Sequence, residues 1–209
     1  CSNMCHESSG TALTASIGIG KGSVSIDDFV AADLIIVAGQ NPGTNHPRML
    51  STLAAAKEAG AHVIAVNPLP ETGLLGFRDP QTVKGLTTGV PIADDFLQIR
   101  LGGDMALFQG LAKLLFDAED ENPGTVFDRD FIESHTAGFA DYERHIRTVD
   151  LDTVVEATGL SLDRLRRTAR LVATSKRTIV CWAMGLTQHT HGVATIEEIT
   201  NLLLARGMI

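Results

Sequence analysis

Four short apolar runs, separated by segments with helical periodicity, constrain the fold of this 209-residue chain more than any other feature. Three of the runs are nearly continuous in apolar character and rich in Val and Ile, as in strands buried on both faces of a parallel sheet. The third run is the least apolar of the four. The predicted strands are residues 33–39 (DLIIVAG), 62–67 (HVIAVN), 96–101 (FLQIRL) and 178–184 (TIVCWAM).

Amphipathic segments between these runs predict helices that alternate with the strands. Pro47 suits the first turn of one helix and Gly60 its C-terminal cap, and Ser161 suits the N-cap of another. Alternating strands and helices favour an α/β fold. We expect one Rossmann-like, three-layer domain over residues 1–209, with a mostly parallel sheet flanked by helices. The predicted helices are residues 47–59, 104–117, a helix that begins after Ser161, and 196–205, with short helices expected between 122 and 150.

Polar residues gather where each predicted strand ends, which is where parallel α/β sheets bind ligands. Asn41, Thr44 and Asn45 follow the first strand directly before a helix. Small side chains and free N–H groups at that position can hold a phosphate or a sugar hydroxyl, or can simply cap the helix. After the third strand, Gly102 lets backbone approach a ligand, and Asp104 either caps the next helix or accepts a hydrogen bond from a ligand.

The charge balance narrows the classes of partner. The net charge is −8, from 17 basic and 25 acidic residues, which disfavours nucleic acid and anionic membranes. A phosphate-bearing cofactor remains compatible, because backbone N–H groups bind anions without lysine. No apolar run reaches the roughly 18–20 residues of a membrane span. The chain has three cysteines, Cys1, Cys5 and Cys181. An odd number does not fit the disulfide framework of a secreted protein, so we expect the protein to be located in the cytoplasm.

A glycine-rich stretch, GIGKGS at residues 18–23, invites comparison with phosphate-binding loops. A Walker loop needs Ser or Thr directly after Gly-Lys, and here Gly22 intervenes. A dinucleotide fingerprint follows a strand and opens a helix, whereas this stretch precedes the first predicted strand. We interpret it as a turn.

Cys5 and His6, near the start of the chain, are the strongest candidates for metal binding or proton transfer. A thiolate is a soft ligand for a soft metal, and an adjacent imidazole can move a proton at neutral pH. Two cysteines and one histidine do not complete a structural zinc site, and an incidental pair stays open at this point. His189 and His191 follow the fourth strand and either line an approach to a site or belong to a solvated loop. Cys181, within that strand, is expected to be a small core residue.

Six segments, in order along the chain, resemble the molybdopterin oxidoreductases of the dimethyl sulfoxide reductase superfamily, in particular the formate dehydrogenase-like alpha subunits. Each segment alone is weakly specific, and six in register are strongly so. The segments are NMCHESS, DDFVAADLIIVAGQNPGTNHPRML, AAAKEAGAHVIAVNP, LGGDMALFQGLAKLL, FDRDFIESHTAGFADY and VCWAMGLTQHTHG.

This resemblance implies a bis(molybdopterin guanine dinucleotide) molybdenum cofactor and two-electron redox chemistry on a small-molecule substrate. It implies that Cys5 is the protein ligand of molybdenum and that His6 takes up a proton as electrons pass to the metal. Many members also carry a [4Fe-4S] cluster upstream of the corresponding segment. The residues that the resemblance places along the cofactor are Asn41, Thr44, Asn45, Asn67, Gly102, Asp104, Met184, Gly185 and Gln188.

The chain also departs from the family pattern. Asn67-Pro68-Leu69 stands where the family commonly has Asp-Pro-Arg, and Leu101 and Gly103 replace the Pro and Thr of the family's P-G-T-D turn. The residues after His6 also differ from those of formate dehydrogenases, so the substrate is left unnamed, as are the electron-transfer partner and the choice between molybdenum and tungsten.

The chain is expected to be a piece of a longer polypeptide whose other domains complete the cofactor site, because it lacks an initiator Met and ends just after an apolar run. Alone, it is expected to be inactive. The alternative from a different class is a Rossmann-like nucleotide-binding or interaction module without catalysis, in which Cys5 and His6 are incidental.

Overall fold

The computed structural model describes residues 4–78, 83 and 87–209. Cys1 lies outside the described residues. The chain forms two compact units. We call residues 24–98 and 176–185 the sheet unit, and residues 4–23, 99–175 and 186–209 the helical unit.

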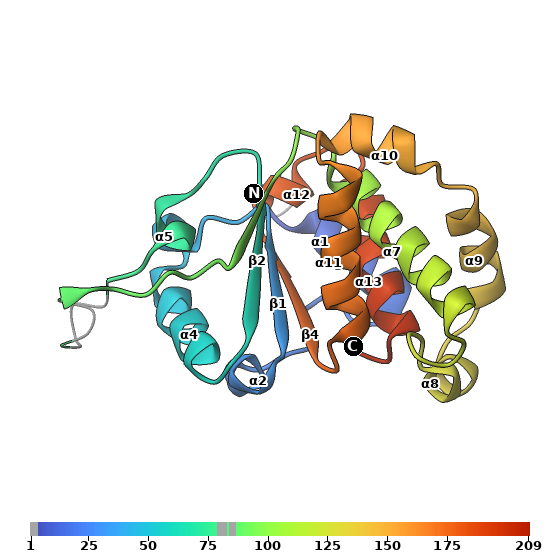
Figure 1. Cartoon of the computed structure of the whole chain (residues 1–209), viewed down its shortest axis with the longest axis horizontal. Coiled ribbons are helices and arrows are strands. Elements are labelled where there is room, and N and C mark those ends of the chain that lie inside the picture. Colours follow the sequence, from blue (N-terminus) through green and yellow to red (C-terminus); the bar gives the residue numbers. More distant parts are fainter. Residues whose placement is uncertain (1–3, 79–82, 84–86) are drawn as a thin grey trace. The chain divides into compact units, whose positions relative to one another are not determined.

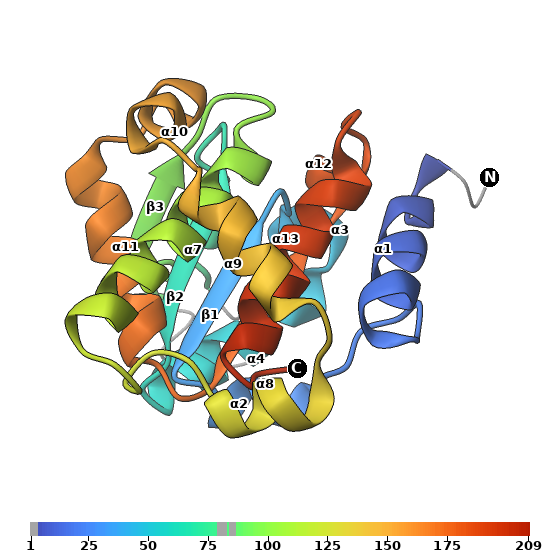
Figure 2. The same cartoon turned by 90° about the vertical axis from the view of Figure 1, so that its right-hand side faces the viewer.

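The sheet unit contains four parallel strands in the order β3-β2-β1-β4, of which Figure 1 labels β2, β1 and β4 and Figure 2 labels β3. Leu34 at the start of β1 lies opposite His62 of β2 and Thr178 of β4. This arrangement confirms the expected α/β class with a parallel sheet and flanking helices. The strands are β1 (Leu34–Ala38), β2 (His62–Asn67), β3 (Asp95–Gln98) and β4 (Thr178–Trp182).

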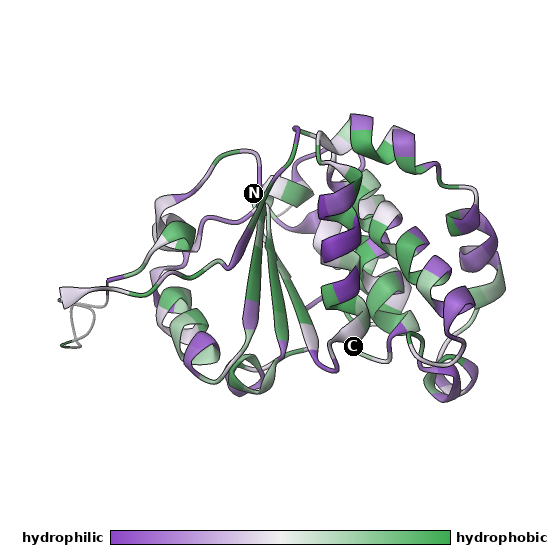
Figure 3. Cartoon of the chain, viewed as in Figure 1, coloured by the Kyte–Doolittle hydropathy of each residue, from purple (hydrophilic) through white to green (hydrophobic). Residues whose placement is uncertain are grey.

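Apolar side chains of β1 and β2 pack with α4 to form the core of the sheet unit. Ile35, Val63 and Leu53 are fully buried in it, and Figure 3 shows the strands as predominantly hydrophobic. Cys181 packs against the same cluster, as expected for a small core residue, and burial raises the pKa of its thiol to about 12. The helices of this unit are α2 (Ile26–Ala31), α3 (Pro42–Asn45), α4 (Pro47–Glu58) and α5 (Thr72–Leu75).

Three predicted strands are too long at their carboxyl ends, and the first, 33–39, exceeds β1 by one residue at each end. The prediction for residues 96–101 was wrong beyond Gln98, because β2 ends at Asn67, the register partner of Gln98. The chain then turns, and the Arg100 backbone nitrogen donates to Thr158 O at 2.9 Å. The prediction for 178–184 was wrong beyond Trp182, because Trp182 pairs with the last residue of β1. Met184 instead begins α12 (Met184–Thr187).

The helical unit is built around α7, against which α11 and α13 pack (Figure 2). α1 packs along α13, so the beginning and the end of the chain meet in this unit. No helix in the described part of the chain is long and apolar enough to cross a membrane. Besides α12, the helices are α1 (Glu7–Ile17), α7 (Asp104–Glu121), α8 (Arg129–His135), α9 (Phe139–Arg147), α10 (Leu151–Thr158), α11 (Leu162–Thr174) and α13 (Gly192–Ala205).

The predicted helices all form, with shifted ends. Ser161 caps α11 as expected, since its side chain accepts from the Arg164 backbone nitrogen. α7 continues to Glu121 and α13 begins at Gly192, so both are longer than predicted. The GIGKGS stretch follows α1 rather than a strand, and Gly18 ends that helix with φ 77°. Its place in the fold agrees with a turn.

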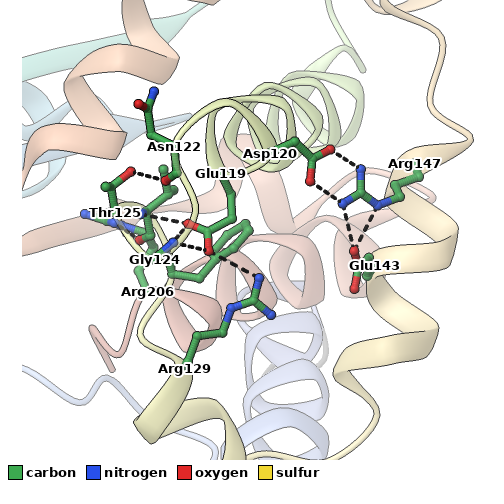
Figure 4. A network of polar contacts seen from close by, with 11 residues as sticks. Glu119, Asp120, Asn122, Gly124, Thr125, Arg129, Glu143, Arg147 and Arg206 are labelled. Carbon is green, nitrogen blue, oxygen red and sulfur yellow. Dashed lines mark hydrogen bonds and ion pairs between the residues drawn. The ribbon is translucent and has the colours of Figure 1, made fainter.

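A buried carboxylate organises the loop between α7 and α8 (Figure 4). Glu119 is 4% exposed and accepts hydrogen bonds from the backbone nitrogens of Gly124 and Val126, both at 2.9 Å. Burial by itself would raise the pKa of Glu119. The backbone hydrogen bonds and the Arg129 guanidinium favour the ionised carboxylate, and together they lower the pKa of Glu119 below its ordinary value. Nearby, the guanidinium of Arg206 donates to Val126 O. The loop is therefore held from both sides.

Candidate cofactor site

The loops after β1 and β4 lie at the topological switch point of the sheet. β1 has β2 on one side and β4 on the other, and ligands of open α/β sheets bind outside the carboxyl ends of strands at such a point. The Gly185 backbone nitrogen donates to Gly39 O at 3.0 Å. A Cβ at residue 185 would lie 2.5 Å from that oxygen. Gly185 thus permits close approach of the two loops, and the neighbouring Met184 is 42% exposed.

Asn41 is occupied by contacts within the protein. Its Oδ1 accepts from the Thr44 backbone nitrogen at 3.3 Å and caps α3, and its Nδ2 donates to Glu71 Oε2 at 2.7 Å. The helix it caps is the short α3 and not α4, whose N-cap is His46. Thr44 and Asn45 have exposed side chains at the surface of this loop.

Gln40 has a buried side-chain oxygen without a hydrogen-bond partner. Among the described residues of the sheet unit, it is the one buried side-chain acceptor of this kind. Gln40 is 6% exposed, and its amide nitrogen lies 3.2 Å from Met49 Sδ. Its Oε1 has no hydrogen-bond partner. The side chain of Asn67 donates to Gln40 O at 3.3 Å, so Asn67 supports this loop from β2. Since buried polar atoms are nearly always paired, Gln40 Oε1 is suited to a ligand N–H donor.

Cys5 and His6 lie in the helical unit, immediately before α1. Cys5 is exposed and its thiol is free. His6 Nδ1 lies 3.3 Å from the hydroxyl of Ser9, which is 8% exposed and one turn into the helix. Ser9 therefore fixes the orientation of the His6 ring and leaves Nε2 as the nitrogen directed elsewhere.

The segment around Cys5 is tied to the loop that begins α13. Thr187 Oγ1 donates to Cys5 O at 2.6 Å, and Thr187 O accepts from Ser8 Oγ at 3.0 Å. Gln188 Nε2 donates to Met4 O at 3.0 Å. Gln188, expected along the cofactor, is thus brought beside the segment that contains Cys5.

Asp104 faces a second feature of the helical unit, a cavity of about 270 Å³. Asp104 is 8% exposed, and burial raises the pKa of its carboxyl, while the nearby His189 opposes that rise. Asp104 is the first residue of α7 rather than its cap, which is Gly103, so the capping alternative is wrong. Gly102 has φ 80° and open space where a Cβ would be. The residues lining the cavity are Gly102, Asp104, Leu186, His189, Thr190, His191 and Thr195.

The predicted site residues therefore fall into two sets. The helical unit holds Cys5 and His6 near Gln188, and Gly102 with Asp104. Within the part of the chain that the structure describes, no three His, Cys, Asp or Glu side chains gather into a metal-binding cluster. The sheet unit holds Asn41, Thr44, Asn45, Asn67, Met184 and Gly185 at or near the carboxyl ends of its strands.

Sequence reasoning missed three residues that shape these sets. Gln40 stands within the quoted loop after β1 but was not singled out, and the only signal for it was its place next to a strand end. Ser9 and Thr187 act through contacts with His6 and Cys5. The Ser9 contact follows from helical spacing, whereas the Thr187 contact joins residues 182 positions apart.

Polar loops at the switch point of a parallel sheet define an α/β protein of the cofactor-binding class. The chain belongs to the molybdopterin oxidoreductase family, whose model matches residues 2–209.

Similar proteins agree with this assignment. An uncharacterized oxidoreductase of Mycobacterium tuberculosis H37Rv is 65% identical over 210 residues, which cover all of this chain and 27% of that protein. Formate dehydrogenase H of Escherichia coli K12 is 29% identical over 207 residues, which cover 99% of this chain and 26% of that protein. The chain thus spans about a quarter of the length of these relatives.

A solved structure shows the same fold. Acetylene hydratase from Pelobacter acetylenicus matches with a TM-score of 0.78 and 21% identity, over 99% of this chain and 25% of that one. The expected family and fold are therefore confirmed.

Proposed function

We propose that the chain is part of a molybdenum-dependent oxidoreductase and that it binds a bis(molybdopterin guanine dinucleotide) cofactor through its strand-end loops, with Cys5 as protein ligand. The observation that carries the proposal is the exposed, free thiol of Cys5, fixed through its own carbonyl by Thr187, in a chain of this family. A thiolate is the donor type that soft metal centres prefer.

The residues present fit such a cofactor. The unpartnered Gln40 Oε1 can accept from an N–H group of a pterin or guanine ring, both of which carry amino groups. The loops at the strand ends offer backbone N–H groups to anionic phosphates, which accounts for binding by a chain of net charge −8. Gly102 leaves open space at the cavity lined by Asp104.

When bound, the metal centre would supply the capacity to take up or release two electrons. Cys5 would hold the metal as a soft donor. His6 would accept or deliver a proton at Nε2, because Nδ1 faces Ser9. Asp104, nearly buried and facing its cavity, would accept hydrogen bonds from the cofactor or from substrate.

The finer features of the parent protein belong to the same proposal. The substrate is a small molecule handled in a formate dehydrogenase-like manner. Where the parent carries a [4Fe-4S] cluster upstream, as many family members do, that cluster would supply a route for electrons to an external partner. The remaining domains of the polypeptide complete the cofactor site, in the cytoplasm. Residues 1–209 act as one cofactor-binding domain, inactive without those domains.

The test is metal and pterin analysis of the full-length parent from a molybdenum-replete host, together with Cys5→Ala and Cys181→Ala variants. We expect molybdenum and releasable guanine nucleotide in the wild type, loss of redox turnover in Cys5→Ala, and turnover retained in Cys181→Ala, which removes a thiol from the core. A folded parent with neither metal nor pterin would refute the proposal. Unchanged turnover in Cys5→Ala would favour the noncatalytic Rossmann-like module.

A further inference from the structure

Three hydrogen bonds join residues 4–8 to Thr187 and Gln188, and we call them the N-terminal clamp. Two of them involve Thr187, whose hydroxyl donates to Cys5 O at 2.6 Å and whose carbonyl accepts from Ser8 Oγ at 3.0 Å. The third runs from Gln188 Nε2 to Met4 O at 3.0 Å. Thr187 therefore bonds Cys5 and Ser8, and Gln188 bonds Met4, the residue before the Cys5–His6 pair.

The clamp matters because it acts on an exposed segment of the chain. Met4, Cys5 and His6 are all exposed, and Met4 is 68% exposed. Thr187, in contrast, is 7% exposed and is followed closely by α13, against which α1 packs. The direction of a cysteine Cα–Cβ bond follows from its own backbone, so a bond to Cys5 O orients the thiol without touching the sulfur.

We propose that Thr187 is a positioning residue for the metal-ligating cysteine, acting through the carbonyl of Cys5. This inference rests on the proposed function of Cys5 as the ligand. It also assigns the side-chain nitrogen of Gln188 to the clamp, so that Gln188 supports the ligand segment through Met4. Contacts to groups beyond the ligating atom orient a metal ligand and tune the metal, so they matter for affinity and activity.

The test compares Thr187→Val, which removes the hydroxyl at nearly constant volume, with Thr187→Ser, which retains it. The matched control is Thr168→Val, because Thr168 is 4% exposed and its hydroxyl bonds only a carbonyl within α11, Arg164 O at 3.0 Å. Gln188→Met is a second variant at an exposed position, where folding is not at risk.

The first readout is amide hydrogen exchange of the peptide containing residues 4–12, in the full-length protein without cofactor. Loss of one hydrogen bond shifts an opening equilibrium by roughly 2- to 12-fold. We expect exchange in this peptide to rise by about that factor in Thr187→Val, to rise less in Gln188→Met, and to remain at the wild-type rate in Thr187→Ser and Thr168→Val. Unchanged exchange in both Thr187→Val and Gln188→Met would overturn the clamp.

The second readout is the Mo(V) electron paramagnetic resonance signal of the loaded full-length enzyme. A displaced thiolate changes the g-values or adds a second species in Thr187→Val at unchanged molybdenum content, and Thr187→Ser restores the single signal. An unaltered signal in Thr187→Val would overturn the positioning role even if exchange rises. Absence of molybdenum from the wild type would instead refute the proposed function, and the exchange experiment, which needs no metal, separates the two failures.

Discussion

The carboxylate of Glu119 accepts a hydrogen bond from the backbone nitrogen of Val126 at 2.9 Å, and both residues are buried. The same carboxylate also accepts from the Gly124 and Phe127 nitrogens, at 2.9 Å and 3.3 Å. A single ionised side chain near the end of α7 therefore satisfies three backbone donors of the following loop.

Glu119→Gln should destabilise the chain. The amide keeps one acceptor but presents an N–H₂ group to backbone donors, and charge-assisted hydrogen bonds contribute about 1.5–3 kcal/mol each at most. We expect a loss of about 2–3 kcal/mol in the free energy of unfolding, measured by urea titration. Glu121→Gln, at an exposed position two residues away, serves as the control and should change stability by less than about 0.5 kcal/mol. Equal effects of the two variants would contradict this account.

The same carboxylate should make stability depend on acidic pH. The pKa of Glu119 is lower in the folded chain than its ordinary value of about 4.3, so the unfolded chain binds the proton more readily. Its contribution is therefore fully present above that ordinary value and is lost as the pH falls through the folded pKa. Urea midpoints measured from pH 6 to pH 3 should fall less steeply for Glu119→Gln than for the wild type. Parallel curves would show that Glu119 is not responsible.

Asp104→Asn should stabilise the isolated chain at neutral pH. Burial raises the pKa of Asp104, so stability falls as the pH rises through its ordinary value of about 3.9 toward the folded pKa. Removing the charge should raise the free energy of unfolding by about 1 kcal/mol at pH 7, measured by urea titration. Below pH 3, where the carboxyl is protonated in both states, it should bring no gain in stability. The control is Asp163→Asn, an exposed first-turn residue of α11, which should lose roughly 0.3–1 kcal/mol of helix-dipole interaction. A loss of similar size in both variants would contradict the prediction.

Gly110→Ala should show how tightly α7 and α10 pack. A Cβ at residue 110 would lie 2.6 Å from Val154 Cγ1. In the wild-type background we therefore expect Gly110→Ala to lower the free energy of unfolding by about 1–3 kcal/mol. In a Val154→Ala background the clash is gone, and Gly110→Ala should be neutral or stabilising by up to about 1 kcal/mol through helix propensity. A double-mutant cycle by thermal or urea unfolding measures the difference. Additive effects would mean that the two helices separate easily.

The fold was predictable where local pattern and partner strands agree. β2 has the predicted bounds, residues 62–67, because its apolar run is paired on both sides. The predictions for the third and fourth strands ran too long, because the length of a strand is set by its pairing with a neighbouring strand and not by its own sequence alone. α13 begins earlier than predicted because Gly192 is a weak helix former that tertiary packing nevertheless places in the helix.

The candidate site was predictable mainly through resemblance. Strand-end residues such as Asn41 and Gly185 follow from the topology rule, and Cys5 with His6 follows from chemistry and family likeness. Asn41 proved to be satisfied by Glu71, a contact 30 residues away that no local pattern contains. Gln40 and Thr187 were not predicted for the same reason. Their roles depend on contacts with residues that are distant in the sequence, such as Asn67 for Gln40 and Cys5 for Thr187.

The bond from Thr187 to Cys5 O joins residues that are 182 positions apart, and this sets an order in time. When the ribosome has released only the strands β1 to β3, neither Thr187 nor α13 exists to receive α1. The bond to Cys5 O therefore cannot form until some 180 further residues have been synthesised. The backbone of Cys5 therefore takes its fixed orientation only after Thr187 has been synthesised, which makes it a late step in the folding of the helical unit.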